Sequence, residues 1–240
     1  MSTTKTAVVL GAGPGLGMSI AHRFGREGYR VALVSRSDTR HGAYLTSLAE
    51  AGIEAAAFTA DLSDKERLDT VLDEILARFG TIDLAYYGPA AMDGPMPGLI
   101  AEAGSADVRA AMELVYPAVD AVGKVLPGMI ERGSGGFLFA GGLSSVVPMP
   151  TLGALAVMTA ALRNYAITLN AGLSTTGVYA GALTIGGLIE RGDIHKAMSS
   201  DPNMFGDTKI ATLDPDGIAD TAWDLFSKRD RAEAVFNALG

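Results

Sequence analysis

Short apolar runs alternate along this chain with longer stretches in which apolar residues recur every three or four positions. Residues 7–10 form the first continuous apolar run, and Ile20, Ala21 and Phe24 follow at helical spacing. The same alternation predicts further strands at 31–34, 53–59, 82–86, 178–185 and 232–238, and one strand that begins after the turn at 134–136. Strands that alternate with helices indicate an α/β fold with a doubly wound parallel sheet of about seven strands and helices on both faces.

Several residues mark where the helices begin and end. Tyr44, Leu45, Leu48 and Ala49 predict the inner face of a helix that stops at Gly52. Ser63 and Glu66 have the spacing of a capping box at the start of the next helix. Two long helices, 106–131 and 152–173, are apolar on more than one side and therefore predict a second packing partner. Pro117 predicts a kink or a local irregularity in the first of them.

Composition narrows the class of protein. Hydrophobic residues make up 48% of the 240 residues and mean hydropathy is +0.25, which suits a sheet covered on both faces. The net charge of −8 and the lack of a basic stripe argue against nucleic-acid binding. There is no cysteine, and no apolar run reaches the about 18 residues of a membrane span. We expect one domain over residues 1–240, located in the cytoplasm and not in a membrane.

A glycine-rich loop joins the first strand to the first helix. It reads Gly11-Ala12-Gly13-Pro14-Gly15-Leu16-Gly17. Glycine at the first position allows a tight turn, at the fifth it lets a pyrophosphate approach the backbone, and at the seventh it lets the helix pack closely. The first-turn N–H groups then face the phosphates. The loop predicts a dinucleotide site, and the alternative is a glycine-rich turn without a ligand.

This loop and the order of elements resemble the short-chain dehydrogenase/reductase family. The spacing Gly11-x-x-x-Gly15-x-Gly17 is the form typical of that family, and Asp61-Leu62 after the third strand matches it too. The resemblance covers nearly the whole chain and implies a single Rossmann-fold domain with a variable lid at about 186–212. It also implies these cofactor-binding residues: Gly11, Gly13, Pro14, Gly15, Leu16, Gly17, Ser35, Arg36, Ala60, Asp61, Leu62 and Gly88.

The end of the second strand bears on which cofactor is bound. A protein that prefers NAD carries an acidic residue there, whereas this chain has Ser35 followed by Arg36. A guanidinium offers forked donors to a 2′-phosphate, so NADP(H) is favoured over NAD(H). The alternative is that Arg36 is an ordinary surface arginine. In the family, Asp61 binds the adenine amino group, and here it also has the place of a turn residue beside Ser63.

The catalytic residues that the resemblance implies are missing. The family uses a tyrosine as acid and base with a lysine four residues later, and none of the seven tyrosines here has that lysine. Placed on the family's pattern, the asparagine, serine, tyrosine and lysine positions hold Leu114, Gly142, Leu155 and Thr159. The usual Asn-Asn-Ala-Gly after the fourth strand is replaced by Tyr87-Gly88-Pro89-Ala90. The usual mechanism is therefore not expected.

Other residues offer weak substitutes. Tyr86 or Tyr87 at the end of the fourth strand could donate a proton and Ser144 or Ser145 could polarise a carbonyl, but a pocket-filling role for the tyrosines is the simpler interpretation. The histidines, His22, His41 and His195, share no metal-ligand spacing, so no metal site is expected.

Two hypotheses of different class follow from this sequence. The first is an NADP(H)-binding relative without the usual chemistry, with a binding, sensing or partner role. The second is an NADP(H)-dependent oxidoreductase of a carbonyl or alcohol with a non-standard proton donor. The resemblance also implies a homodimer or homotetramer whose interface contains the two long helices, and a small-molecule ligand under the lid.

Overall fold

The computed structural model describes residues 4–89, 98–200 and 211–239, and its centre is a parallel sheet of seven strands in the order β3-β2-β1-β4-β5-β6-β9. The strands of this sheet are β1 (Thr6–Leu10), β2 (Arg30–Ser35), β3 (Ala55–Thr59), β4 (Leu84–Tyr87), β5 (Gly135–Gly142), β6 (Val178–Gly186) and β9 (Glu233–Asn237). β1 and β4 are buried along their whole length, as a sheet with two covered faces requires. The predicted α/β fold is confirmed.

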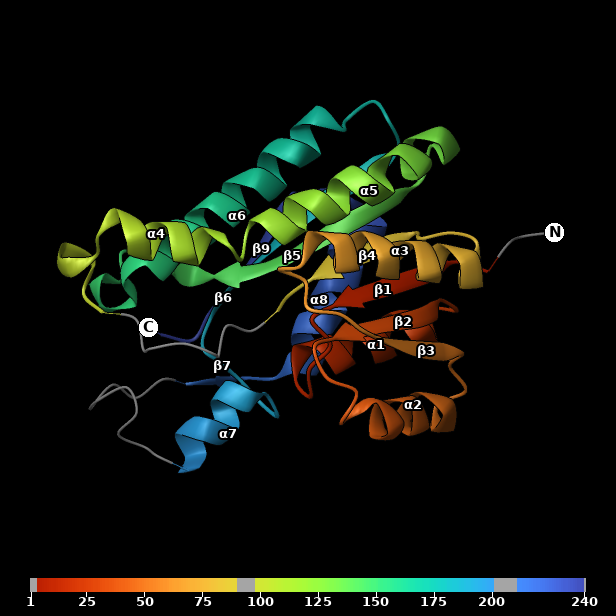
Figure 1. The fold of residues 1–240 in the computed structure, drawn as a ribbon, viewed down its shortest axis with the longest axis horizontal. Coiled ribbons are helices and arrows are strands. Elements are labelled where there is room, and N and C mark those ends of the chain that lie inside the picture. Colours follow the sequence, from red (N-terminus) through yellow and green to blue (C-terminus); the bar gives the residue numbers. More distant parts are fainter. Residues whose placement is uncertain (1–3, 90–97, 201–210, 240) are drawn as a thin grey trace.

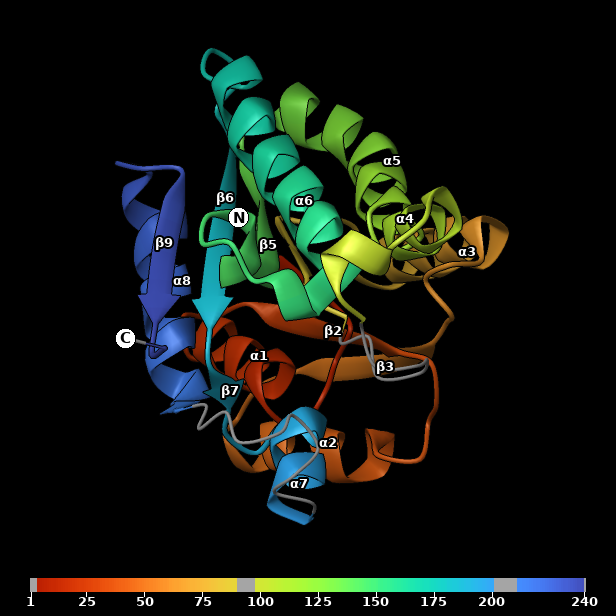
Figure 2. The ribbon, with the colours of Figure 1, turned by 90° about the vertical axis from the view of Figure 1, so that its left-hand side faces the viewer.

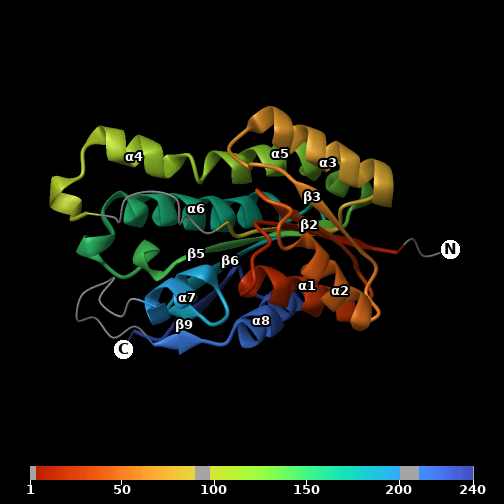
Figure 3. The ribbon, with the colours of Figure 1, turned by 60° about the horizontal axis from the view of Figure 1, so that its bottom comes forward.

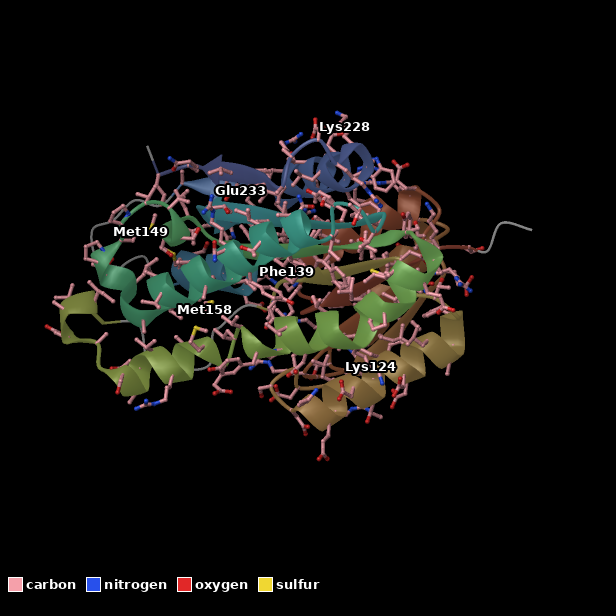
Figure 4. All side chains as sticks on the ribbon, turned by 90° about the horizontal axis from the view of Figure 1, so that it is seen from above. Lys124, Phe139, Met149, Met158, Lys228 and Glu233 are labelled. Carbon is pink, nitrogen blue, oxygen red and sulfur yellow. The ribbon has the colours of Figure 1, made fainter. Side chains whose placement is uncertain are left out.

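Helices cover both faces of this sheet. They are α1 (Leu16–Arg26), α2 (His41–Glu50), α3 (Lys65–Phe79), α4 (Ser105–Met112), α5 (Tyr116–Arg132), α6 (Gly153–Gly172), α7 (Asp193–Ser200) and α8 (Pro215–Lys228). Figure 3 shows three layers, with α3, α5 and α6 on one side of the sheet and α1, α2 and α8 on the other. Lys124 on α5 and Lys228 on α8 accordingly lie on opposite sides (Figure 4).

Each face has its own apolar core. The core beneath α3, α5 and α6 includes Val8, Tyr87 and Phe137, and the core beneath α1 and α8 includes Val9, Tyr86 and Leu138. Consecutive strand residues such as Val8 and Val9 enter different cores because side chains alternate across a strand. This alternation sends the neighbouring tyrosines of β4 to opposite faces of the sheet.

Three details of the helices correct the sequence interpretation. The expected helix 106–131 is two helices, because the chain leaves the helix between Met112 and Tyr116 and Pro117 then lies in the first turn of α5. The N-cap of α3 is Asp64, whose carboxylate accepts the Arg67 N–H at 3.0 Å, and not the expected Ser63. Ala49 is exposed, so the inner face of α2 is narrower than predicted.

The chain returns from β6 through a small second sheet to α8. β7 (Leu188–Ile189) pairs in parallel with β8 (Thr212–Leu213), and α7 lies between them in sequence. Figures 2 and 3 place α7 on the side of the sheet that carries α1 and α2. We call residues 188–200 the lid segment. It forms the first part of the lid expected at 186–212, of which residues 201–210 lie outside the described residues.

One helical stretch in the described chain, Pro150–Gly172, is long and apolar enough to cross a membrane by length and composition alone. Polar residues interrupt this stretch, so the sequence contains no uninterrupted apolar run of that length. In the fold this stretch contains α6, which packs on β5 and β6. Only 28% of its most apolar window is buried, so much of the helix faces outward.

Candidate functional site

The glycine loop lies where the sheet order reverses, between β1 and β4. Gly11 has a φ of +96°, and a Cβ atom there would lie 2.6 Å from the nitrogen of Pro89. The N–H groups of Gly11 and Ala12 both donate to the carbonyl of Val34 at the end of β2. Only glycine meets the positive φ and the close approach together, and the turn predicted for Gly11 is found. Ala90 lies outside the described residues.

The start of α1 keeps free backbone donors. Gly15 is its N-cap and makes no side-chain cap. Met18 and Ser19 donate back to the carbonyls of Gly13 and Gly15. In the part of the chain that the structure describes, the N–H groups of Leu16 and Gly17 find no backbone acceptor. Such donors at a helix N-terminus suit a phosphate, so the loop fits the dinucleotide that the sequence predicts.

The lid segment lies against this loop. A Cβ atom at Gly15 would be 3.1 Å from the carbonyl oxygen of Glu190 and 3.1 Å from the nitrogen of Gly192. The predicted role of Gly15 was to leave its face open to a pyrophosphate. In this structure the backbone of Glu190 and Gly192 covers that face of Gly15. Glu190 and Gly192 therefore leave little room for a phosphate on that face of Gly15.

Two ion pairs hold the lid segment in this position. Arg40 lies just before α2, and its two terminal guanidinium nitrogens donate to the carboxylate of Asp193 at 2.7 and 2.9 Å. Arg191 pairs with Asp216 of α8 at 2.8 Å and donates to the hydroxyl of Ser19 at 3.1 Å. Sequence reasoning missed these contacts, since no local pattern links Arg40 to a residue 153 positions away.

The predicted adenosine residues come together at the adjoining ends of β2 and β3. Ser35 is paired with Thr59 in the sheet, and the Ala60 N–H donates to the Ser35 carbonyl at 3.0 Å. Asp61 accepts the backbone N–H and the hydroxyl of Ser63, at 3.0 and 2.8 Å. These bonds, with a smaller contribution from the charge of Arg36, hold the pKa of Asp61 below its usual range. Asp61 thus has the turn role that was its alternative, and its adenine role stays a prediction.

The positions assigned to the family's serine and lysine do meet in space. A Cβ atom at Gly142 would lie 3.1 Å from Cγ2 of Thr159 and 3.3 Å from the hydroxyl oxygen of Ser144. The Ser144 and Thr159 hydroxyls are hydrogen-bonded to each other at 2.9 Å, and both residues are buried. Two neutral hydroxyls therefore occupy this part of the site, with Leu155 half-buried one turn before Thr159.

Tyr87 reaches the position assigned to the family's asparagine. Its hydroxyl donates to the backbone carbonyl of Leu114 at 2.7 Å, in the break between α4 and α5. Tyr87 is only 3% exposed, and burial raises its pKa well above the usual tyrosine range. Tyr86 is fully buried in the opposite core, and burial raises its pKa in the same way. Both tyrosines fill the interior, as their simpler interpretation expected.

A small apolar hollow lies beside Ser144. Its volume is about 180 Å³, and its lining consists of Ile100, Ser144, Pro148, Met149, Pro150 and Ala156. Met149 stands at the end of the fold just before α6 (Figure 4). The hollow offers one hydroxyl among apolar side chains, which suits a small ligand with few polar atoms.

The histidines have separate surroundings. The His22 ring is hydrogen-bonded to Ser47 at 2.9 Å, the His41 ring to Ser35 at 2.7 Å, and His195 lies in α7. Within the described ranges, no group of three or more histidines, cysteines or carboxylates is placed to hold a metal ion.

Comparison with known proteins gives one consistent result. The sequence profile described as short chain dehydrogenase matches residues 5–200. A short chain dehydrogenase of Pseudocercospora fijiensis is 29% identical over 76% of this chain and 59% of its own length. A 3beta-hydroxysteroid dehydrogenase of Eggerthella lenta is 44% identical over 33% of this chain and 31% of its own. The chain thus spans less than two thirds of these curated relatives.

Solved structures resemble the whole chain. The actinorhodin polyketide ketoreductase with NADPH has a TM-score of 0.85 at 21% identity and covers 100% of this chain and 98% of its own. The L-sorbose reductase of Gluconobacter frateurii with NADPH and L-sorbose has a TM-score of 0.79 at 22% identity, with 99% and 98% coverage. At these identities the similarity establishes the fold.

Proposed function

The chain belongs to the short chain dehydrogenase family, and from that membership we propose that it binds NADP(H) without carrying out the usual chemistry of the family. Its role is then binding, sensing or partnership with another protein. The observation that carries this proposal is the hydrogen-bonded pair Ser144 and Thr159 beside Gly142, where acid and base groups are expected.

The missing groups have a definite chemical cost. Hydride transfer to a carbonyl needs a proton at the carbonyl oxygen, and a positioned acid contributes about 10²–10⁴-fold to the rate. A threonine at 159 has no charge to lower a phenol pKa, and Leu155 has no proton to give. The Tyr87 hydroxyl donates its hydrogen bond to the Leu114 carbonyl, and burial raises its pKa. Both make Tyr87 a poor acid for a substrate.

Arg36 supports NADP(H) over NAD(H). It follows Ser35 at the end of β2, close enough to Asp61 for its charge to affect that carboxyl. The solved relatives named above contain NADPH, which adds weight to the same choice. The free N–H groups of Leu16 and Gly17 would hold the pyrophosphate once the lid segment has moved.

The second candidate function is an NADP(H)-dependent oxidoreductase with a non-standard proton donor. The observation in its favour is the hollow that Ser144 lines, because a small carbonyl or alcohol there would meet one hydroxyl. The Thr159 hydroxyl also donates to the Ala156 carbonyl at 3.1 Å, so Ser144 is the donor in the Ser144–Thr159 bond and its oxygen can accept a hydrogen bond from an alcohol.

A homodimer or homotetramer is part of the proposal. α6 is apolar with little of its surface buried, and Tyr116, Val119 and Val157 on α5 and α6 are exposed. Exposed apolar residues on neighbouring helices suit contact with a second copy. The cytoplasmic location, the single-domain boundary 1–240 and the individual cofactor residues remain predictions.

Titration with NADPH and NADH, followed by fluorescence or calorimetry, tests the proposal. Arg36→Ala should weaken NADPH much more than NADH, while Arg109→Ala on α4 serves as a control for losing an exposed arginine. Equal weakening of both cofactors would contradict the 2′-phosphate assignment. Absence of any nucleotide binding would refute both functions.

Turnover separates the two functions. NADPH oxidation should stay near background at high protein concentration against a broad carbonyl panel. Turnover that Ser144→Ala or Tyr87→Phe abolishes would establish the second function instead. Tyr87→Phe should also lower stability, because the Leu114 carbonyl loses its donor.

A further inference from the structure

A second hollow lies between α1 and α2, on the outer side of α1 from the sheet. Its volume is about 330 Å³, and it opens beside Pro14 of the glycine loop. Ligand pockets begin at about 300 Å³, so it has room for a small molecule. None of the other residues assigned to cofactor binding lines it. We call it the α1–α2 pocket.

The spacing along α1 places polar groups in this pocket. Ser19, His22 and Arg26 lie on one side of the helix, because residues three and four apart share a face. Ser47 of α2 lies opposite, and its hydroxyl is hydrogen-bonded to Nε2 of His22 at 2.9 Å. The two helices are thus joined across the floor of the pocket by a polar contact.

Two donors in the pocket are not used by the described chain. The Tyr44 hydroxyl is buried, with the residue 8% exposed; the Arg40 guanidinium acts on its oxygen, but its proton has no acceptor in the described chain. Burial raises the pKa of Tyr44, so the hydroxyl keeps a proton to donate at neutral pH. Arg26 is exposed and makes no hydrogen bond or ion pair with the described residues. A buried hydroxyl whose proton has no acceptor is costly, which points to a ligand that supplies the acceptor.

The lid segment closes one wall with a third donor. Arg191 has a φ of 65° and reaches the Ser19 hydroxyl and the Asp216 carboxylate. Among the described residues that line the pocket, Asp216 is the one carboxylate, and its pair with Arg191 is half-exposed, at 52% for each side chain. Such a pair is weak in water. Two guanidinium groups against one carboxylate leave the pocket with net positive charge.

We propose that the α1–α2 pocket binds a small phosphate-bearing molecule at a site separate from the dinucleotide loop. Arg26 and Arg191 supply forked donors from α1 and from the lid segment, and the Tyr44 and Ser47 hydroxyls supply donors from α2. Phosphate oxygens accept from several directions at once, which matches donors arranged on three walls.

His22 gives this site a direct reporter. Burial lowers the pKa of His22, and the charges of Arg26 and Arg191 lower it further, while Asp216 acts in the opposite direction. Tyr44 of α2 is the remaining titratable group that lines the pocket, and it is neutral. A bound phosphate adds negative charge beside the ring and must raise the pKa of His22.

The test uses inorganic phosphate and the ring signals of the three histidines by NMR. His22→Gln identifies the His22 signals. Phosphate should shift them and raise the pKa of His22, whereas chloride at equal ionic strength should not. Phosphate bound only at the helix N-terminus would move the amides of Leu16 and Gly17 and leave the His22 ring unchanged, which would overturn the proposal.

Matched variants then assign the contacts. Arg26→Gln should weaken phosphate about tenfold, as expected for the loss of one charge-assisted hydrogen bond. Arg78→Gln removes an equivalent arginine from the last turn of α3 and should leave phosphate binding unchanged. Equal effects of both variants would overturn the proposal.

NADPH and NADH identify the source of the phosphate. Added NADPH should leave phosphate in the α1–α2 pocket. Displacement by NADPH but not by NADH would overturn the separate site and assign the pocket to the 2′-phosphate of the cofactor. The response of His22 to phosphate stands whether or not the chain binds a nucleotide, so failure of the proposed function is distinguishable.

Discussion

The ion pair between Arg40 and Asp193 should lower the affinity of the chain for a nucleotide. The lid segment covers Gly15, and this bidentate ion pair holds it there. A nucleotide then binds only the fraction of molecules whose lid segment has moved, and its apparent affinity falls by that fraction. Asp193→Asn keeps the shape of the side chain and removes its charge. This substitution should weaken the interaction with Arg40 and raise the affinity for NADPH.

The size of the change in NADPH affinity follows from the solvent exposure of the ion pair. The side chains of Arg40 and Asp193 are 49% and 40% exposed, so solvent screens their attraction and the pair is worth about 0.2–1 kcal/mol. Two parallel N–H donors place it in the upper part of that range. With about 1.4 kcal/mol for each factor of ten, NADPH affinity should rise about two- to fivefold.

Fluorescence titration with NADPH measures the change directly. Asp224→Asn is the matched control, because it breaks a pair of similar exposure with Lys228 on the far part of α8. Amide hydrogen exchange gives a second readout, in which residues 188–200 of Asp193→Asn should exchange faster without any nucleotide. Unchanged exchange together with equal or weaker NADPH affinity would refute the reasoning.

Two further predictions concern stability. Gly11→Ala should lower the free energy of unfolding by more than about 2 kcal/mol, because it adds the clash with Pro89 to the strain of a positive φ. Gly28→Ala, at φ +85° but in open space, should lower it by about 1 kcal/mol. Urea unfolding measures both, and equal losses would contradict the close approach at Gly11. The ion pair with Arg163 holds the pKa of Glu233 below its usual range, so the pair's contribution is present above about pH 4.3 and is lost as pH falls through the lowered pKa. Glu233→Gln should therefore cost about 1 kcal/mol at pH 7 and progressively less in acid, and a loss independent of pH would count against the pair.

The strands and the glycine turn could be predicted from the sequence because their causes are local. Continuous apolar runs require a sheet covered on both faces, and the seven predicted strands all appear within a few residues of their expected ends. The N-cap of α8 also has a local cause, because Asp214 accepts the Asp216 N–H at 2.9 Å just before Pro215. Asp64 was missed as a cap because Ser63, one residue away, has equally good chemistry.

The assignment of Leu114, Gly142, Leu155 and Thr159 to the family's catalytic positions stays a prediction. The sequence shows that the usual tyrosine and lysine pair is absent, since no tyrosine precedes a lysine by four residues. That Gly142, Ser144 and Thr159 lie in contact depends on how β5 and α6 pack. The Tyr87 bond to the Leu114 carbonyl likewise needs the break between α4 and α5 to expose that carbonyl.

The sequence by itself determined the α/β order, the tight turn at Gly11 and the absence of a lysine four residues after any tyrosine, because each depends on residues close together in the chain. Only the tertiary structure decided that the lid segment covers Gly15, that Arg40 pairs with Asp193, and that Arg191 and Asp216 line the pocket beside α1 and α2. The physical reason is distance along the chain. Contacts between segments more than a hundred residues apart are set by how whole layers pack, and no local periodicity records them.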